Sequence, residues 1–110
     1  EEQWDILLKD LNTKFNADMD LQGVLFLIGV QELGKGYVQF AKDQKIDVMH
    51  IAVCTLLEPY GYYEYEGRDG DGWPHWKVKE NLPPLKTAQQ NQLIKEAMVE
   101  YFKREESKDL

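Results

Sequence analysis

Cysteine is nearly absent from the sequence: Cys54 stands alone, so no disulfide can form within the chain. Small secreted domains usually depend on several disulfides, and a single cysteine therefore argues against a stapled extracellular scaffold. We expect a cytoplasmic protein. Long apolar runs are also lacking. The longest, Leu21 to Val30, is interrupted by a glutamine and two glycines and is shorter than the roughly 20 residues that a transmembrane helix needs, so we expect no membrane partner.

Positive charge is scarce as well. The chain has 13 lysines and arginines against 20 acidic residues, a formal net charge of −7, and this field repels phosphate backbones. The basic residues are scattered among acids and form no stripe, which argues against nucleic acid as a partner. We expect a protein partner or a small neutral or cationic ligand, with self-association into a homo-oligomer as a further possibility.

The size and balance of the chain predict one globular domain over residues 1–110. Hydrophobic residues make up 43% and charged residues 30% of the 110 positions, which is typical of a folded domain with a core. This balance argues against disorder and against a fibrous structure.

Hydrophobic periodicity predicts four helices. The first, Gln3 to Phe15, has apolar residues on one face only, whereas the second, Leu21 to Leu33, is apolar on nearly every side and should be central. Asp18 or Asp20 is expected to cap the second helix. Its glycines, Gly23 and Gly29, lower helix stability, and we expect them to allow neighbouring backbones to approach closely.

The third helix should run from near Lys42 to Glu58, because the residue before Pro59 is disfavoured in a helix. Its main buried stripe is expected to hold Ile46, Met49, Val53, Leu56 and Leu57, widened by Val48 and Ala52. The fourth helix should begin at a capping box formed by Thr87 and Gln90. Its buried face is expected to hold Leu93, Ile94, Ala97, Met98, Tyr101 and Phe102.

Between the third and fourth helices, Tyr62 to Glu66 alternates aromatic and acidic residues, and Trp73 to Lys79 is rich in aromatic and β-branched ones. The turn-forming stretch Gly67 to Gly72 separates them, so the pattern predicts a short β-hairpin. Pro74 should delay the second strand or place it at an edge. The predicted fold class is mainly α: a compact four-helix domain with this hairpin, an α+β fold being the alternative.

One stripe on the third helix, made of Asp43, Asp47, His50 and Cys54, could contribute metal ligands. His50 and Cys54 are spaced for two zinc ligands, and His75 could be a third. Two histidines and one cysteine are few for a zinc site, so the competing interpretation is that His50 is hydrogen-bonded to Asp47 and Cys54 is packed as a small apolar residue. Nucleophilic chemistry at Cys54 is disfavoured, because acidic neighbours raise a thiol pKa.

The loop Arg68 to Gly72 superficially matches a calcium-binding loop, with alternating carboxylates and glycines. Its register is wrong. Aligning Gly72 with the invariant glycine places Gly67 at the first ligand position and Val78 where a bidentate glutamate is needed. We therefore expect aspartate and glycine to serve turn conformations here.

The hairpin region concentrates aromatic residues beside carboxylates, and aromatic side chains with polar neighbours make good recognition surfaces. The alternative is that these aromatic side chains only cover the core. The candidate binding residues are Tyr62, Tyr63, Tyr65, Asp69, Asp71, Trp73, His75 and Trp76.

Two segments, LFLIGVQELGKG and HIAVCTLLEPYGYYEYEGRDGDGWPHW, resemble a family of small uncharacterised bacterial proteins. The resemblance covers Leu25 to Trp76. It implies a compact helical domain without an assigned activity, and it transfers no catalytic or binding residues.

The sequence therefore favours a non-catalytic binding or protein-interaction module, without cofactor or catalytic residues, that uses the aromatic and acidic hairpin surface. The alternative is a small metal-dependent or hydrolytic enzyme built on Asp47, His50, His75 and nearby carboxylates such as Glu58 and Asp71. A pocket that holds both histidines would favour the enzyme. An exposed tryptophan and tyrosine patch away from them would favour the module.

Overall fold

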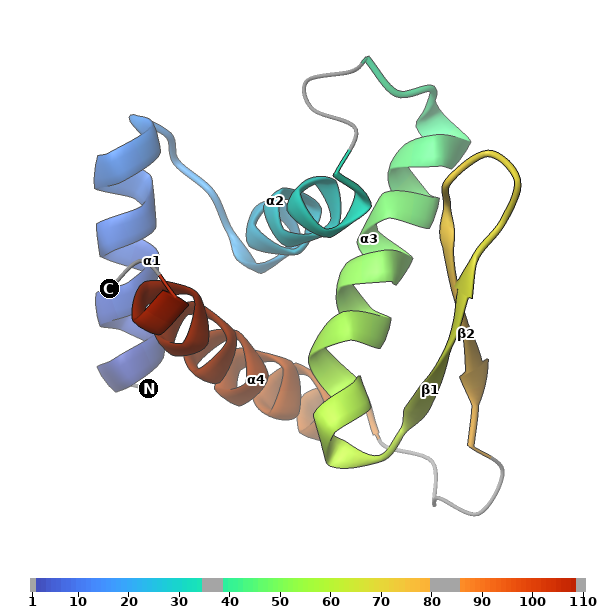
Figure 1. Ribbon diagram of the computed structural model, residues 1–110. Helices are drawn as coiled ribbons and strands as arrows, with labels where there is room; N and C mark the ends of the chain where they lie inside the picture. The colour runs from blue at the N-terminus through green and yellow to red at the C-terminus, as the bar shows by residue number, and fades with distance from the viewer. Residues whose placement is uncertain (1, 35–38, 80–85, 109–110) are drawn as a thin grey trace. The chain divides into compact units, whose positions relative to one another are not determined.

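The computed structural model describes residues 2–34, 39–79 and 86–108 (Figure 1). Within these residues a β-hairpin lies between the third and the fourth of four α-helices, which confirms the predicted mainly α fold class. In chain order the elements are α1 (Glu2–Phe15), α2 (Leu21–Leu33), α3 (Lys42–Leu57), β1 (Tyr63–Arg68), β2 (Pro74–Val78) and α4 (Thr87–Lys108). None of the helices in the described part of the chain is both long and apolar enough to cross a membrane.

Contacts divide the chain into two compact units. The terminal unit comprises Glu1–Leu21 and Pro84–Leu110, and the central unit comprises Gln22–Pro83. The organisation of residues 1–110 as one domain stays a prediction.

In the terminal unit, α1 and α4 pack against each other. The buried side chains of the two helices belong to the faces predicted for them: Trp4, Leu11, Ile94, Ala97, Met98 and Tyr101. Phe15 was expected on the same face of α1 but is 48% exposed at the end of the helix. The start of α4 also differs from the prediction, because the Lys86 backbone N–H donates to Gln89 Oε1 (3.1 Å), one residue before the expected Thr87 and Gln90 pair.

In the central unit, α2 exposes only Gln22 and Gln31, as its all-round apolar pattern predicted. Gly29 is buried against α3, and a Cβ atom added there would lie 2.1 Å from the Val48 carbonyl oxygen. The prediction that a glycine of α2 permits close backbone approach is confirmed at this position. The helix begins directly after Asp20, one of the two expected capping residues.

The buried face of α3 agrees with the prediction except near the start of the helix. The expected residues Val48, Ala52, Leu56 and Leu57 are buried. Ile51 is also buried, although it was not predicted, whereas Ile46, expected in the core, is 63% exposed. The close contact with Gly29 explains the difference, because it turns Val48 toward α2 and thereby places Ile46 on the opposite side of the helix. A short 3-10 turn, Glu58–Tyr60, follows α3 and contains Pro59, the residue that was predicted to end the helix.

The hairpin pairs β1 and β2 in antiparallel register, with Tyr63 opposite Val78 and Tyr65 opposite Trp76. The register shifts between Tyr65 and Gly67, where Gly67 adopts a left-handed φ of 104°. Such a bulge inserts one residue and increases the local twist of the strand. β2 starts at Pro74 and not at Trp73, which agrees with the predicted delay of the second strand.

Candidate functional site

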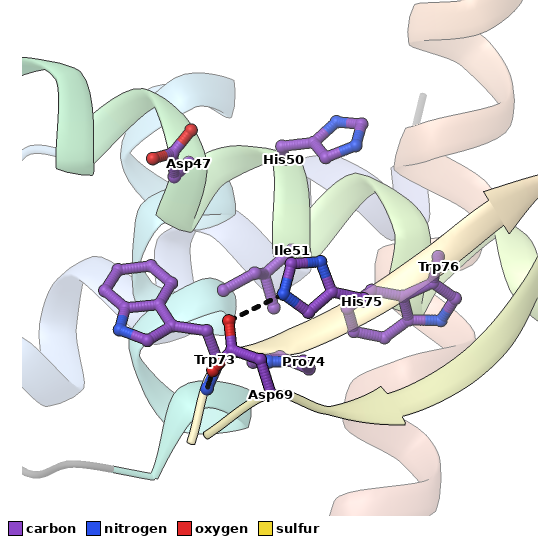
Figure 2. Close-up of a pocket in the computed structure, with 8 residues that line it drawn as sticks. All are labelled: Asp47, His50, Ile51, Asp69, Trp73, Pro74, His75 and Trp76. Atoms are coloured by element: carbon purple, nitrogen blue, oxygen red, sulfur yellow. Dashed lines mark hydrogen bonds and ion pairs between the residues drawn. The ribbon is translucent and has the colours of Figure 1, made fainter. Parts of the chain in front are cut away.

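A pocket of about 330 Å³ lies in the central unit between α3 and the hairpin (Figure 2). We call it the α3–hairpin pocket. Its lining includes four of the eight candidate binding residues and both histidines of the chain. The lining residues are Asp47, His50, Ile51, Asp69, Trp73, Pro74, His75 and Trp76.

The α3 wall consists of Asp47, His50 and Ile51, which are spaced three and four residues apart and therefore share one helix face. Ile51 is 4% exposed and belongs to a buried cluster with Leu33 and Val48. Asp47 and His50 are exposed. The wall thus has an apolar base with a carboxylate and an imidazole at its rim.

Asp69 organises the hairpin loop through both carboxylate oxygens. Its Oδ1 accepts the backbone N–H groups of Asp71 (2.9 Å) and Trp73 (3.0 Å), and its Oδ2 lies 2.7 Å from His75 Nε2. The hydrogen bond from His75 and those from the backbone lower the Asp69 pKa to about 2. The carboxylate is therefore ionised and accepts a hydrogen bond from the Nε2–H group of His75. In a neutral His75 ring this leaves Nδ1 as the basic nitrogen.

Both indoles of the pocket are half-buried. Trp73 and Trp76 pack against the buried cluster of Leu33, Val48 and Ile51. Trp76 Nε1 also donates to Glu58 Oε2 (3.2 Å) on the turn after α3. Each indole contributes both to the core and to the pocket wall, and Figure 2 shows them on either side of His75.

His50 contacts Cys54 and Tyr63. Its Nε2 lies 3.4 Å from Cys54 Sγ, and the Tyr63 ring meets its imidazole edge-on at 6.2 Å. The expected hydrogen bond with Asp47 is replaced by these contacts. Cys54 is 0% exposed, and burial, together with the charge of Glu58, raises its pKa to about 12. The thiol is therefore protonated at neutral pH, as expected of a packed, unreactive cysteine.

The weak metal candidates do not assemble. Among the described residues, no three histidine, cysteine, aspartate or glutamate side chains are grouped so that they could hold a metal ion. His50 and Cys54 are neighbours, but His75 forms no three-ligand group with them. A structural zinc site normally needs four ligands.

Arg68 is a positioning residue that the sequence did not reveal. Its Nη1 donates to the carbonyl oxygens of Leu33 (2.9 Å) and Gly72 (2.7 Å), and its Nη2 donates to that of Glu32 (2.8 Å). The last carbonyls of a helix lack partners within the helix and favour a nearby cation. Arg68 thus connects the hairpin loop to the end of α2. An arginine beside a predicted turn gives no signal for a partner 35 residues away.

The other candidate binding residues lie outside this pocket. Tyr63 contacts His50, as described, and the Tyr65 ring packs at 5.3 Å from that of Trp76. The Tyr62 carbonyl oxygen accepts the Lys79 N–H (3.2 Å) at the open end of the hairpin. Asp71 donates its backbone N–H to Asp69 in the loop, which is the turn role predicted for the aspartates.

The chemistry of the pocket is set by two indoles, two imidazoles and two carboxylates. Of the described residues that line it, none is a lysine or arginine, and none carries a hydroxyl or thiol. Among these lining residues the side-chain nucleophiles are imidazoles and carboxylates, and a developing oxyanion would lack a permanently charged partner. Indole faces beside carboxylates are instead suited to a cationic group.

Comparison of the chain with protein-family models, curated proteins and solved structures found no match.

Proposed function

We propose that the protein is a non-catalytic binding module and that the α3–hairpin pocket recognises a cationic group of its ligand. The observation that carries the proposal is the juxtaposition of Trp73 and Trp76 with Asp47 and Asp69 in one pocket. A cation over an indole face gains about 0.5–2 kcal/mol, depending on how far it is desolvated. The net charge of −7 attracts the same class of ligand.

Preorganisation supports recognition by this pocket. Packing against the buried cluster holds both indoles, a hydrogen bond to Glu58 holds Trp76, and hydrogen bonds from the loop backbone hold Asp69. A binding site that is already ordered loses less conformational entropy when the ligand arrives. Because Asp69 is already bonded to His75, Asp47 is the carboxylate that the proposal assigns to the ligand's charge.

The proposal is tested by an NMR titration with N-acetyl-arginine amide. We expect the indole N–H signals of Trp73 and Trp76 to shift, while that of Trp4 in the terminal unit does not. Replacing Asp47 with Asn should weaken binding about tenfold, which corresponds to about 1.4 kcal/mol. Asp43→Asn is the matched control, since it removes the same charge from α3 but does not line the pocket. Equal effects of the two variants would show that only long-range attraction is measured.

A hydrolytic enzyme is the second candidate, and the hydrogen bond between His75 and Asp69 is the observation that favours it. An imidazole oriented by a carboxylate can act as a general base toward water. The presence of both histidines in one pocket was the arrangement expected of an enzyme, but the same pocket also holds both indoles. Saturable hydrolysis of p-nitrophenyl acetate that disappears in His75→Gln would favour this candidate over the binding module.

We infer the cellular setting from the sequence. The single cysteine supports a cytoplasmic location, and the resemblance of Leu25 to Trp76 supports a bacterial origin. The acidic net charge supports a partner other than nucleic acid.

A further inference from the structure

A second pocket of about 220 Å³ adjoins the α3–hairpin pocket in the central unit. We call it the Tyr65 pocket. Pro74 and Trp76 line both pockets, so the two lie on either side of this part of β2. The Tyr65 pocket is formed further by Tyr65 and by residues at the ends of α2 and α3, including Glu32 and Glu58.

The Tyr65 pocket also combines aromatic side chains with carboxylates, but unlike its neighbour it contains an arginine. Tyr65 is 47% exposed, and its ring is tilted by 58° against that of Trp76, so two aromatic groups lie beside the Glu58 carboxylate. Arg68 also lines this pocket, but its guanidinium donates to three backbone carbonyl oxygens. Those bonds hold the guanidinium against the end of α2 and the loop, and the Glu32 and Glu58 carboxylates that line the same pocket outnumber its single positive charge.

We propose that the partner is a polypeptide segment with two basic side chains, one in each pocket, and that this segment lies across Pro74 and Trp76. The inference rests on the proposed function, because the α3–hairpin pocket must accept a cation first. Two adjacent aromatic and acidic pockets on an acidic chain complement a segment with paired positive charges. Arginine matches both features, since a guanidinium stacks on aromatic faces and pairs with carboxylates.

The aromatic rings of the two pockets favour arginine side chains of a polypeptide over the ammonium groups of a polyamine. A guanidinium is planar and weakly hydrated and stacks on aromatic rings, whereas an ammonium is a strongly hydrated point charge. The wall that the two pockets share contains the half-buried Trp76 and carries little charge, so it leaves room for a short spacer between the two arginines. Linking two weakly bound cations also makes the second binding step intramolecular, which raises affinity without new contacts.

The experiment uses acetylated and amidated peptides in which two arginines are separated by a stepwise increasing number of glycines. We expect the best spacer to bind at least about tenfold more tightly than N-acetyl-arginine amide. Asp47→Asn and Glu58→Gln should each reduce the affinity of the best peptide to that of N-acetyl-arginine amide. Gln at position 58 keeps an acceptor for Trp76 Nε1, so the aromatic wall is retained. Asp43→Asn and Glu64→Gln remove the same charges outside both pockets and should leave the gain intact.

Each outcome decides one question. If N-acetyl-arginine amide neither shifts the Trp73 indole nor depends on Asp47, the proposed function itself fails. If it does bind there but no spacer improves affinity, or Glu58→Gln has no effect, only the two-pocket inference is overturned. Equal weakening by the control variants would also overturn it, because the gain would then be non-specific attraction. Equally tight binding of spermidine with the same dependence on Asp47 and Glu58 would replace the polypeptide by a polyamine.

Discussion

Substituting Gly29 by alanine should destabilise the central unit through a clash with the backbone of α3. The added Cβ would lie 2.1 Å from the Val48 carbonyl oxygen and 2.7 Å from Val48 Cγ1. The carbonyl lies within a helical hydrogen-bond ladder and cannot rotate away as a side-chain end could. Overpacking of this kind typically costs about 1–3 kcal/mol, and a backbone clash belongs at the upper end. The higher helix propensity of alanine offsets about 1 kcal/mol of this cost, so we expect the free energy of unfolding to fall by about 2 kcal/mol.

Urea denaturation followed by tryptophan fluorescence measures this loss. Gly70→Ala is the matched control, since a Cβ at Gly70 would have no neighbour within 4 Å, and its effect should stay within about 0.5 kcal/mol. The double variant Gly29→Ala with Val48→Ala should be no more stable than Gly29→Ala, because the carbonyl oxygen remains. A Gly29→Ala protein as stable as the original chain, or one rescued by trimming Val48, would refute the reasoning.

Three further predictions concern the residues that hold the hairpin and the pocket. Arg68→Lys should lower the free energy of unfolding by about 1–2 kcal/mol, because an ammonium cannot bridge the carbonyls that the guanidinium spans; unchanged hydrogen exchange in the hairpin would contradict this. Cys54 should react with a bulky thiol reagent only at the rate of unfolding. Because the folded pKa of Cys54 is about 12 against an ordinary 9.0, its contribution to stability should be complete below pH 9.0 and be lost as the pH rises toward 12, which alkaline denaturation measures. The lowered pKa of Asp69 makes stability depend on pH in the opposite direction. The stabilisation by Asp69 should be complete above its ordinary pKa of 3.8 and be lost as the pH falls toward about 2. In Asp69→Ala, this part of the loss of stability in acid should be absent.

Local signals in the sequence determined the elements themselves. The spacing of apolar residues predicted the buried faces of α1 and α4, and the all-round pattern of α2 predicted a helix without exposed apolar side chains. Pro59 marked the end of α3, and the aspartate and glycine loop marked the hairpin turn. These features depend on residues within a few positions of one another, where periodicity and turn chemistry act directly.

The exposure of Ile46 and the position of the pocket were decided only by tertiary contacts. Gly29 brings α2 against Val48, and this contact leaves Ile46 exposed on the opposite side of α3. Arg68 then connects the hairpin to carbonyl groups 35 and 36 residues earlier in the chain. The stripe that holds Asp47 and His50 therefore meets the loop that holds Asp69 and His75 because of contacts between distant segments, which no local pattern encodes.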